Sequence, residues 1–192
     1  KVIDANDNES PGSIHDALLR EADAIFREDL RTNLAMARLG NTVVPEGAAI
    51  LTHCNTGALA TVGIGTALGV IREAHKSGKN IKVYADETRP RFQGARLTAW
   101  ELVQEGIDAT LIPDSAAAVL IRDGKIDIIL AGADRIAING DTANKIGTFM
   151  LSQLAKDFGV PFYIVAPLST VDFDIASGED IIIEERDAKE VT

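Results

Sequence analysis

The chain has 192 residues, of which 46% are hydrophobic and 25% charged, enough for a domain with a sizeable core; this composition excludes a disordered chain. Its formal net charge of −10 argues against a nucleic-acid-binding or anionic-membrane surface, and no apolar run reaches the roughly 18 residues that a membrane-spanning helix needs. The single cysteine, Cys54, excludes an intrachain disulfide and a multi-cysteine zinc site, and it fits a reducing compartment, so we expect a cytoplasmic protein.

The first 46 residues are expected to lead into the main domain. Residues 1–12 are rich in Asp, Asn, Ser, Pro and Gly, which is typical of a loop or linker. From Ser13, apolar residues recur at steps of three and four, which predicts a long helix that ends near Gly40. Neither end of the chain resembles a natural terminus. We therefore expect residues 1–46 to connect to a further N-terminal domain, and residues 47–192 to form a Rossmann-like domain that continues beyond Thr192.

Beyond residue 47, short apolar runs alternate with helical patterns. Strands are predicted at 48–52, 81–85, 109–112, 126–131 and 161–166, with a sixth at 181–185, and helices at 58–76, 95–105, 115–121 and 144–158. This alternation is typical of βαβ units, and the continuous apolar runs are typical of strands buried on both faces. A TIM barrel needs eight such units. The sequence therefore predicts an α/β fold with an open, doubly wound, mostly parallel sheet, preceded by a helical segment.

Polar residues gather directly after the predicted strands. The segments THCNTG (52–57), DETRPRFQG (86–94), PDS (113–115), GADR (132–135) and PLST (167–170) each follow one strand. In open parallel sheets, ligands bind outside the carboxyl ends of the strands. These segments therefore predict an active site at one edge of the sheet.

Cys54 and its neighbour His53 are the first candidates. A thiol at the start of the predicted helix would have a lowered pKa and act as a thiolate, whereas a lone cysteine is more commonly buried and inert. Adjacent residues of an extended chain point in opposite directions, so a packing or hydrogen-bonding role for His53 is favoured over a dyad with Cys54.

Gly63, Gly65 and Gly69 suggest a dinucleotide-binding motif but do not match its spacing. They fall within the predicted helix rather than in the turn before it. Close packing of that helix against the sheet is therefore the favoured explanation.

Further candidates follow the later strands. Asp134, at the end of an apolar strand, is expected to be partly desolvated and suited to general acid–base chemistry, or to pair with Arg135 or with a basic residue distant in sequence. Asn144 and Lys145, at a predicted helix start, could bind a phosphate or a sugar hydroxyl, although helix capping by Asn144 and a solvated Lys145 is the simpler explanation.

The segment before the second predicted helix is basic. Arg89, Arg91 and Arg96 surround Gln93, and indicate either an anion site or a polar domain contact.

Four of these segments together resemble a known family. THCNTGALAT, ADETRPRFQGARLTAWEL, GADRIAINGDTANKIGT and PFYIVAP are similar, in order, to the methylthioribose-1-phosphate isomerases of methionine salvage. Their superfamily also contains ribose-1,5-bisphosphate isomerase and regulatory subunits of the translation-initiation guanine-nucleotide exchange factor. The motif around Asp134 is more similar to the methylthioribose branch than to either relative.

The resemblance implies a cofactor-free and metal-free aldose–ketose isomerisation of 5-methylthioribose 1-phosphate to 5-methylthioribulose 1-phosphate. It implies that Cys54 and Asp134 are the catalytic pair, and that Gln93, Asn144 and Lys145 bind the substrate. Because the phosphate blocks the anomeric oxygen, the ring must be opened by a proton. Hydrogen then moves from C2 to C1 as a proton or as a hydride. We expect an apolar lining to keep the Asp134 carboxyl protonated.

The family also implies a homodimer, with part of the phosphate site on an N-terminal domain. Three other interpretations stay open. A sister isomerase would act on ribose 1,5-bisphosphate or a 5-deoxyribose 1-phosphate. A non-enzymatic regulatory subunit would be expected to lack the Cys54–Asp134 pair, and a nucleotide-binding Rossmann domain would carry GxGxxG where this chain has HCNTG.

Overall fold

A five-stranded parallel sheet forms the centre of the molecule. The computed structural model describes residues 2–5 and 9–191. The strand order is β3–β2–β1–β4–β7, formed by β1 (Ala49–Thr52), β2 (Lys82–Asp86), β3 (Ala109–Ile112), β4 (Ile128–Ala131) and β7 (Phe162–Ile164). The predicted fold class is confirmed, and five of the predicted strands are present, each with ends within two residues of the predicted ones.

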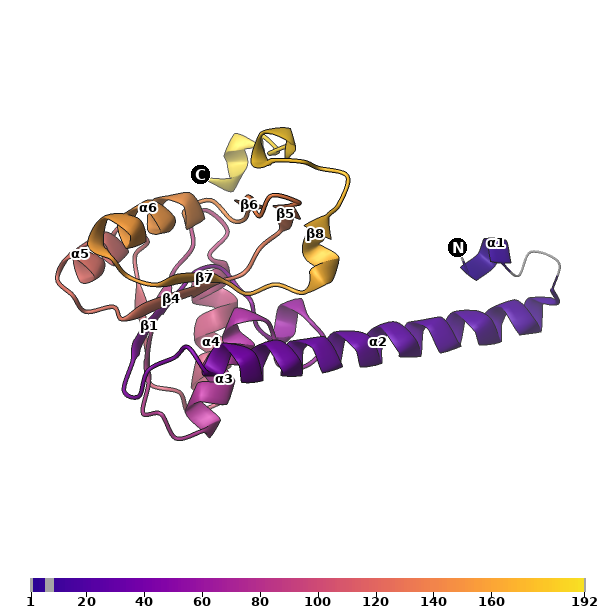
Figure 1. The fold of residues 1–192 in the computed structure, drawn as a ribbon, viewed down its shortest axis with the longest axis horizontal. Helices are drawn as coiled ribbons and strands as arrows, with labels where there is room; N and C mark the ends of the chain where they lie inside the picture. The colour runs from indigo at the N-terminus through magenta and orange to yellow at the C-terminus, as the bar shows by residue number, and fades with distance from the viewer. Residues whose placement is uncertain (1, 6–8, 192) are drawn as a thin grey trace.

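Helices cover both faces of the sheet (Figure 1). One face packs against α3 (Ala67–Lys76) and α4 (Ala99–Gln104), and the other against α5 (Ala116–Arg122) and α6 (Thr148–Phe158). Successive residues of β1 serve opposite faces, as the pleat requires: Ile50 joins the cluster under α3, and Leu51 joins the cluster under α5 and α6. The sheet is therefore buried on both sides, which explains its continuous apolar runs.

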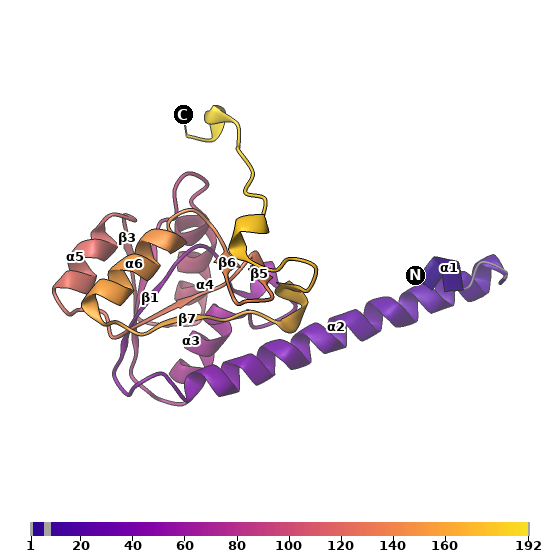
Figure 2. The same cartoon turned by 45° about the horizontal axis from the view of Figure 1, so that its top comes forward.

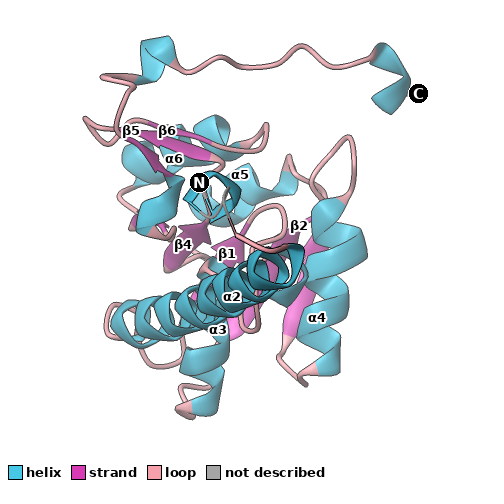
Figure 3. Cartoon of the chain, turned by 90° about the vertical axis from the view of Figure 1, so that its right-hand side faces the viewer, coloured by secondary structure: helices cyan, strands magenta, loops and turns pink. Residues whose placement is uncertain are grey.

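A long helix, α2 (Pro11–Asn41), precedes the sheet as predicted. Ser10 caps it by accepting a hydrogen bond from the Ser13 amide. Only the C-terminal part packs closely on the domain, where Gly40 lies against Val70 of α3. The N-terminal part projects from the body (Figures 1 and 3).

A short helix, α1 (Val2–Ala5), lies within the predicted N-terminal loop, of which residues 6–8 are outside the described residues. None of the described helices is both long and apolar enough to cross a membrane.

Irregular elements cluster at the carboxyl edge. A small second sheet joins β5 (Arg135–Ala137), β6 (Thr142–Ala143) and β8 (Val171–Asp172), and a π-helical turn, η2 (Gly94–Thr98), precedes α4. Three 3-10 turns, η3 (Leu168–Thr170), η4 (Gly178–Asp180) and η5 (Ala188–Glu190), follow β7.

Three sequence predictions need correction. The helix expected at 58–76 is a 3-10 turn, η1 (Ala58–Ala60), a loop, and then α3, because Gly63 and Gly65 adopt φ values of +103° and +88° that no helix contains. The helix expected at 144–158 begins only at Thr148. The strand expected at 181–185 is absent from the described residues: this β-prone run has no partner strand, and it extends over the carboxyl edge of the sheet (Figure 2).

Candidate active site

The chain crosses from one side of the sheet to the other at β1, which pairs with β2 and with β4. A crevice forms at such a point, outside the carboxyl ends of the strands. Cys54 follows β1 and Asp134 follows β4, so the two predicted catalytic residues lie on either side of this crevice.

Two adjoining cavities occupy this edge. A cavity of about 250 Å³ is lined by Cys54, Asp134 and Asn144 and by residues of the loop after β7. A second cavity, of about 650 Å³, shares Asp134 and Asn144, adds Lys145, and has residues 181–191 as its outer wall. Four of the five predicted site residues therefore line two cavities that share Asp134 and Asn144, although they are distant in sequence.

Cys54 adopts an uncommon backbone conformation. Its φ of +64° is in the left-handed region, which side chains with a Cβ rarely occupy. Its amide donates to Thr88 Oγ1 at 2.9 Å, and its carbonyl accepts from Thr98 Oγ1 at 2.5 Å. The side chain is partly buried and faces the smaller cavity.

The environment of the Cys54 sulfur differs from the sequence prediction. Burial raises the pKa of the thiol; the Asn55 amide and Lys145 oppose this, and Asp134 adds to it. The expected helix terminus, which would have lowered the pKa, is wrong because α3 begins only at Ala67. The resting group is a neutral thiol, held within electrostatic reach of Asp134 and Lys145.

His53 has the predicted hydrogen-bonding role, fully buried. Its Nδ1 lies 2.8 Å from Asp86 Oδ2, and its Nε2 donates to the carbonyl of Ile146 at 2.8 Å. Burial lowers the pKa of His53, but its hydrogen bond to Asp86 and the charge of that carboxylate outweigh burial and leave the pKa above its ordinary value. The pair ties the end of β1 to β2 and to the turn after Lys145. Gly147 leaves the space for the imidazole, because a Cβ there would overlap the ring.

His53, Asp86 and Asp114 place potential metal ligands within 4.8 Å of one another. Both nitrogens of His53 are already hydrogen-bonded, and Asp114 accepts from the amides of Thr88 and Arg89. The protein itself satisfies the His53 nitrogens, Asp86 Oδ2 and the Asp114 carboxylate, whereas Asp86 Oδ1 is buried without a partner among the described residues. These hydrogen bonds hold three loops together.

Asp134 is more open than expected. The sequence predicted a partly desolvated carboxylate with an apolar lining, but the residue is exposed. The alternative pairing with Arg135 is also wrong, because Arg135 binds Asp172 at 2.6 Å. The amide of Asp134 donates to the carbonyl of Ala143, which connects it to Asn144. Asp134 lines both cavities.

Asn144 and Lys145 precede α6 rather than starting it. Gly147 is the N-cap residue, so the expected capping by Asn144 is wrong. The Asn144 side chain instead donates to Thr148 Oγ1 at 3.0 Å, which directs its amide along the cavity wall. Lys145 lines the larger cavity and is partly buried.

Gln93 and the arginines lie on a neighbouring loop. Gln93 directly precedes η2, and its Oε1 is buried without a partner among the described residues. Arg91 pairs with Glu190, and Arg89 donates to the carbonyl of Val191 and lies over the Phe92 ring. These contacts fit the polar-contact interpretation, since the two arginines hold the C-terminal segment rather than line either cavity.

The loop after β1 has two features that differ from the sequence prediction. Gly65 lies in the turn before α3, and it has no room for a Cβ against the Thr56 carbonyl, so close packing accounts for it. Asp29 of α2, which the sequence analysis missed, lines the smaller cavity and accepts from the amide of Val62 at 2.7 Å. A carboxylate on a long polar helix gave no sequence signal for this role.

The sequence and the fold have counterparts in known proteins. The family model of the Initiation factor 2 subunit family matches residues 3–192, and the chain belongs to this family. It is 71% identical, over all 192 residues, to a methylthioribose-1-phosphate isomerase of Thermoanaerobacter sp. (strain X514), of which it covers 56%. The chain thus spans about half the length of the curated relatives it matches.

Two solved structures show the same arrangement. The 5-methylthioribose 1-phosphate isomerase of Pyrococcus horikoshii OT3 superposes with a TM-score of 0.93 at 48% identity, over 99% of this chain and 53% of that one. The translation initiation factor eIF-2B subunit delta from A. fulgidus gives a TM-score of 0.88 at 44% identity, over 98% of this chain and 55% of that one.

Proposed function

We propose that the protein is a methylthioribose-1-phosphate isomerase, converting 5-methylthioribose 1-phosphate to 5-methylthioribulose 1-phosphate in methionine salvage. One observation carries the proposal: Cys54 and Asp134 flank the crevice at the sheet's crossover and open onto one cavity with Asn144. Two proton-transferring groups at one hollow suit an isomerisation that moves a single hydrogen between neighbouring carbons. Relatives named for this reaction are 71% and 48% identical to this chain over nearly its whole length.

The proposed steps conserve protons. The resting Cys54 thiol first gives its proton to the Asp134 carboxylate, which leaves a thiolate and a protonated Asp134. Asp134 gives a proton to the ring oxygen, and the bond between that oxygen and C1 breaks. Cys54, as a thiolate, takes the proton from C2, which leaves an enol between C1 and C2. Cys54 then returns the proton to C1, and Asp134 regains one from the C2 hydroxyl as the ketone forms. Asp134 finally returns the first proton to Cys54, so both residues end as they began.

The remaining predicted residues bind the substrate in this proposal. Lys145 offers a cation at the larger cavity for the phosphate, and Asn144 offers an amide for a sugar hydroxyl. Gln93, with its unpartnered buried oxygen beside the same sheet edge, is proposed as a third contact. The Lys145 charge also lowers the pKa of Cys54, which favours the thiolate.

We further propose a cytoplasmic homodimer whose partner is a small sugar phosphate rather than nucleic acid or a membrane. The net charge of −10 argues against a nucleic-acid or anionic-membrane partner, and the single free cysteine fits a reducing compartment. The homodimer is what the resemblance to the isomerase family implies.

Turnover by the full-length protein tests the function. The substrate is 5-methylthioribose 1-phosphate, with ribose 1,5-bisphosphate as the rival, and a new ketone carbon is followed by 13C NMR. We expect a ketone signal from the methylthio sugar. A ketone from the bisphosphate alone would assign the sister isomerase, and turnover of neither by a folded protein would favour a regulatory subunit.

A further inference from the structure

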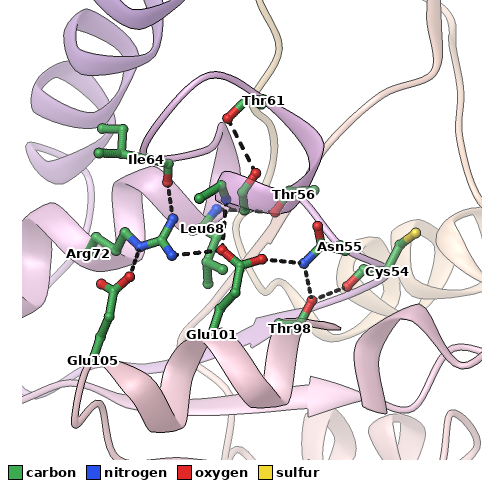
Figure 4. A network of polar contacts seen from close by, with 12 residues as sticks. Cys54, Asn55, Thr56, Thr61, Ile64, Leu68, Arg72, Thr98, Glu101 and Glu105 are labelled. Carbon is green, nitrogen blue, oxygen red and sulfur yellow. Dashed lines mark hydrogen bonds and ion pairs between the residues drawn. The ribbon is translucent and has the colours of Figure 1, made fainter. Parts of the chain in front are cut away.

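A buried polar network lies directly beneath the Cys54 turn (Figure 4). Glu101 of α4 is 3% exposed, and its carboxylate accepts three hydrogen bonds. Oε1 accepts from Asn55 Nδ2 at 2.8 Å, and Oε2 accepts from the Ala58 amide and from Arg72 Nη2, each at 2.7 Å. One carboxylate therefore binds two points of the loop that follows Cys54.

Thr98 adds a hydrogen bond to Cys54 itself. It lies three residues before Glu101, on the same side of the helix, and it is 1% exposed. Its hydroxyl donates to the Cys54 carbonyl and accepts from Asn55 Nδ2 at 3.2 Å. Thr98 and Glu101 thus hold residues 54, 55 and 58 against α4.

The network buries the charge of the Glu101 carboxylate, and the guanidinium of Arg72 compensates this charge. Arg72 is 5% exposed and also binds Glu105 and the carbonyl of Ile64. Gly57 makes the approach possible, because a Cβ at that position would overlap the Glu101 carboxylate. Because burying an ion pair carries a desolvation cost, the contacts of the Glu101–Arg72 pair with the Cys54 turn require an explanation.

The explanation lies in the backbone of Cys54. Its φ of +64° is unfavourable for a residue with a Cβ and persists only when surrounding contacts enforce it. Figure 4 shows the sulfur directed away from the network, while the carbonyl faces Thr98. The network therefore binds the main chain of Cys54 and leaves its sulfur on the side of the smaller cavity.

We infer that Glu101 and Thr98 are positioning residues, which enforce the left-handed conformation of Cys54 and thereby aim its sulfur at the substrate. The inference rests on the proposed function for its catalytic consequence, but the positioning itself is a property of the resting protein. Because reacting groups tolerate little displacement, loosening the turn lowers kcat more than it changes KM.

The chain offers matched controls for the test. Glu105 also binds Arg72, at 2.5 Å, but none of its described contacts reaches the Cys54 turn, so E105Q disturbs the ion pair alone. T98S keeps the hydroxyl that T98V removes. In the full-length protein, each variant is assayed for thermal stability, for kcat and KM, and for the rate at which iodoacetamide alkylates Cys54, followed by peptide mass spectrometry.

We expect E101Q and T98V to lower kcat by about 10- to 100-fold with KM within about 3-fold, and to speed alkylation at fixed pH by about 3-fold or more as the turn loosens. E105Q and T98S are expected to stay within about 2-fold of the unmodified protein. Alkylation rates for E101Q and T98V that match their controls would overturn the inference. Alkylation needs no substrate, so the result stands even if the proposed turnover is absent. If E101Q does not fold, the comparison of T98V with T98S tests the inference.

Discussion

The floor and the outer wall of the site are built in different ways. The floor beneath Cys54 consists of His53, Asp86, Thr98 and Glu101, each 3% exposed or less and joined by hydrogen bonds. The outer wall carries the exposed Asp134 and the segment of residues 181–191, in which Ile182 is 94% exposed. The difference indicates that the floor supplies precision, whereas the wall supplies access for a ligand. Changes to the floor should therefore affect folding and geometry, and changes to the wall should affect chemistry alone.

The largest effect on folding is expected from Gly147→Ala. Any Cβ there would overlap the His53 ring, and the φ of +106° disfavours alanine. Gly140→Ala is the control, since Gly140 has a φ of +90° but open space around it. Both should lose about 1–2 kcal/mol from backbone strain. Only G147A should lose about 1–3 kcal/mol more from overpacking. Urea denaturation measures the difference, and equal losses would show that the imidazole is not tightly held.

A smaller effect on the floor follows from pH. Asp86 outweighs burial and raises the pKa of His53, so the stabilisation is complete below the unfolded value of about 6.5 and is lost as pH rises through the folded value. Burial raises the pKa of Asp86, and its hydrogen bond to His53 opposes that rise. The stability gap between the unmodified protein and His53→Gln should shrink from pH 6 toward alkaline pH. A gap independent of pH would contradict the assigned contact.

The smallest shifts are expected at the wall. Lys145 lowers the pKa of Cys54 and Asp134 raises it. In Lys145→Gln, the alkylation of Cys54 should therefore need a higher pH, and in Asp134→Asn a lower pH, both measured as rate against pH. Thermal midpoints should change little in either variant. Shifts in the same direction for both would show that the two side chains do not face the thiol as described.

The sequence could predict the wall better than the floor. Asp134 follows a predicted strand, so the parallel-sheet rule places it at the carboxyl edge, and Asn144 and Lys145 stand out at the start of the next predicted helix. Arg72 and Glu101 look like ordinary charges on amphipathic helices, and only the packing of α3 against α4 reveals that they are buried. The left-handed φ of Cys54 could not be predicted from the sequence, because glycine is the residue that usually signals this conformation. Residues 181–185 have strand propensity but no neighbouring strand to pair with, so the strand predicted from propensity alone does not form.

The kcat values of Cys54→Ala and Asp134→Asn with 5-methylthioribose 1-phosphate test the central claim most directly. Each variant should lose at least about 100-fold in kcat, because each removes a proton-transferring group. Asp134→Asn should retain its thermal midpoint, because the side chain is exposed and its described hydrogen bond is made by the backbone amide. Turnover near that of the unmodified protein in either variant would contradict the assignment of Cys54 and Asp134 as the catalytic pair.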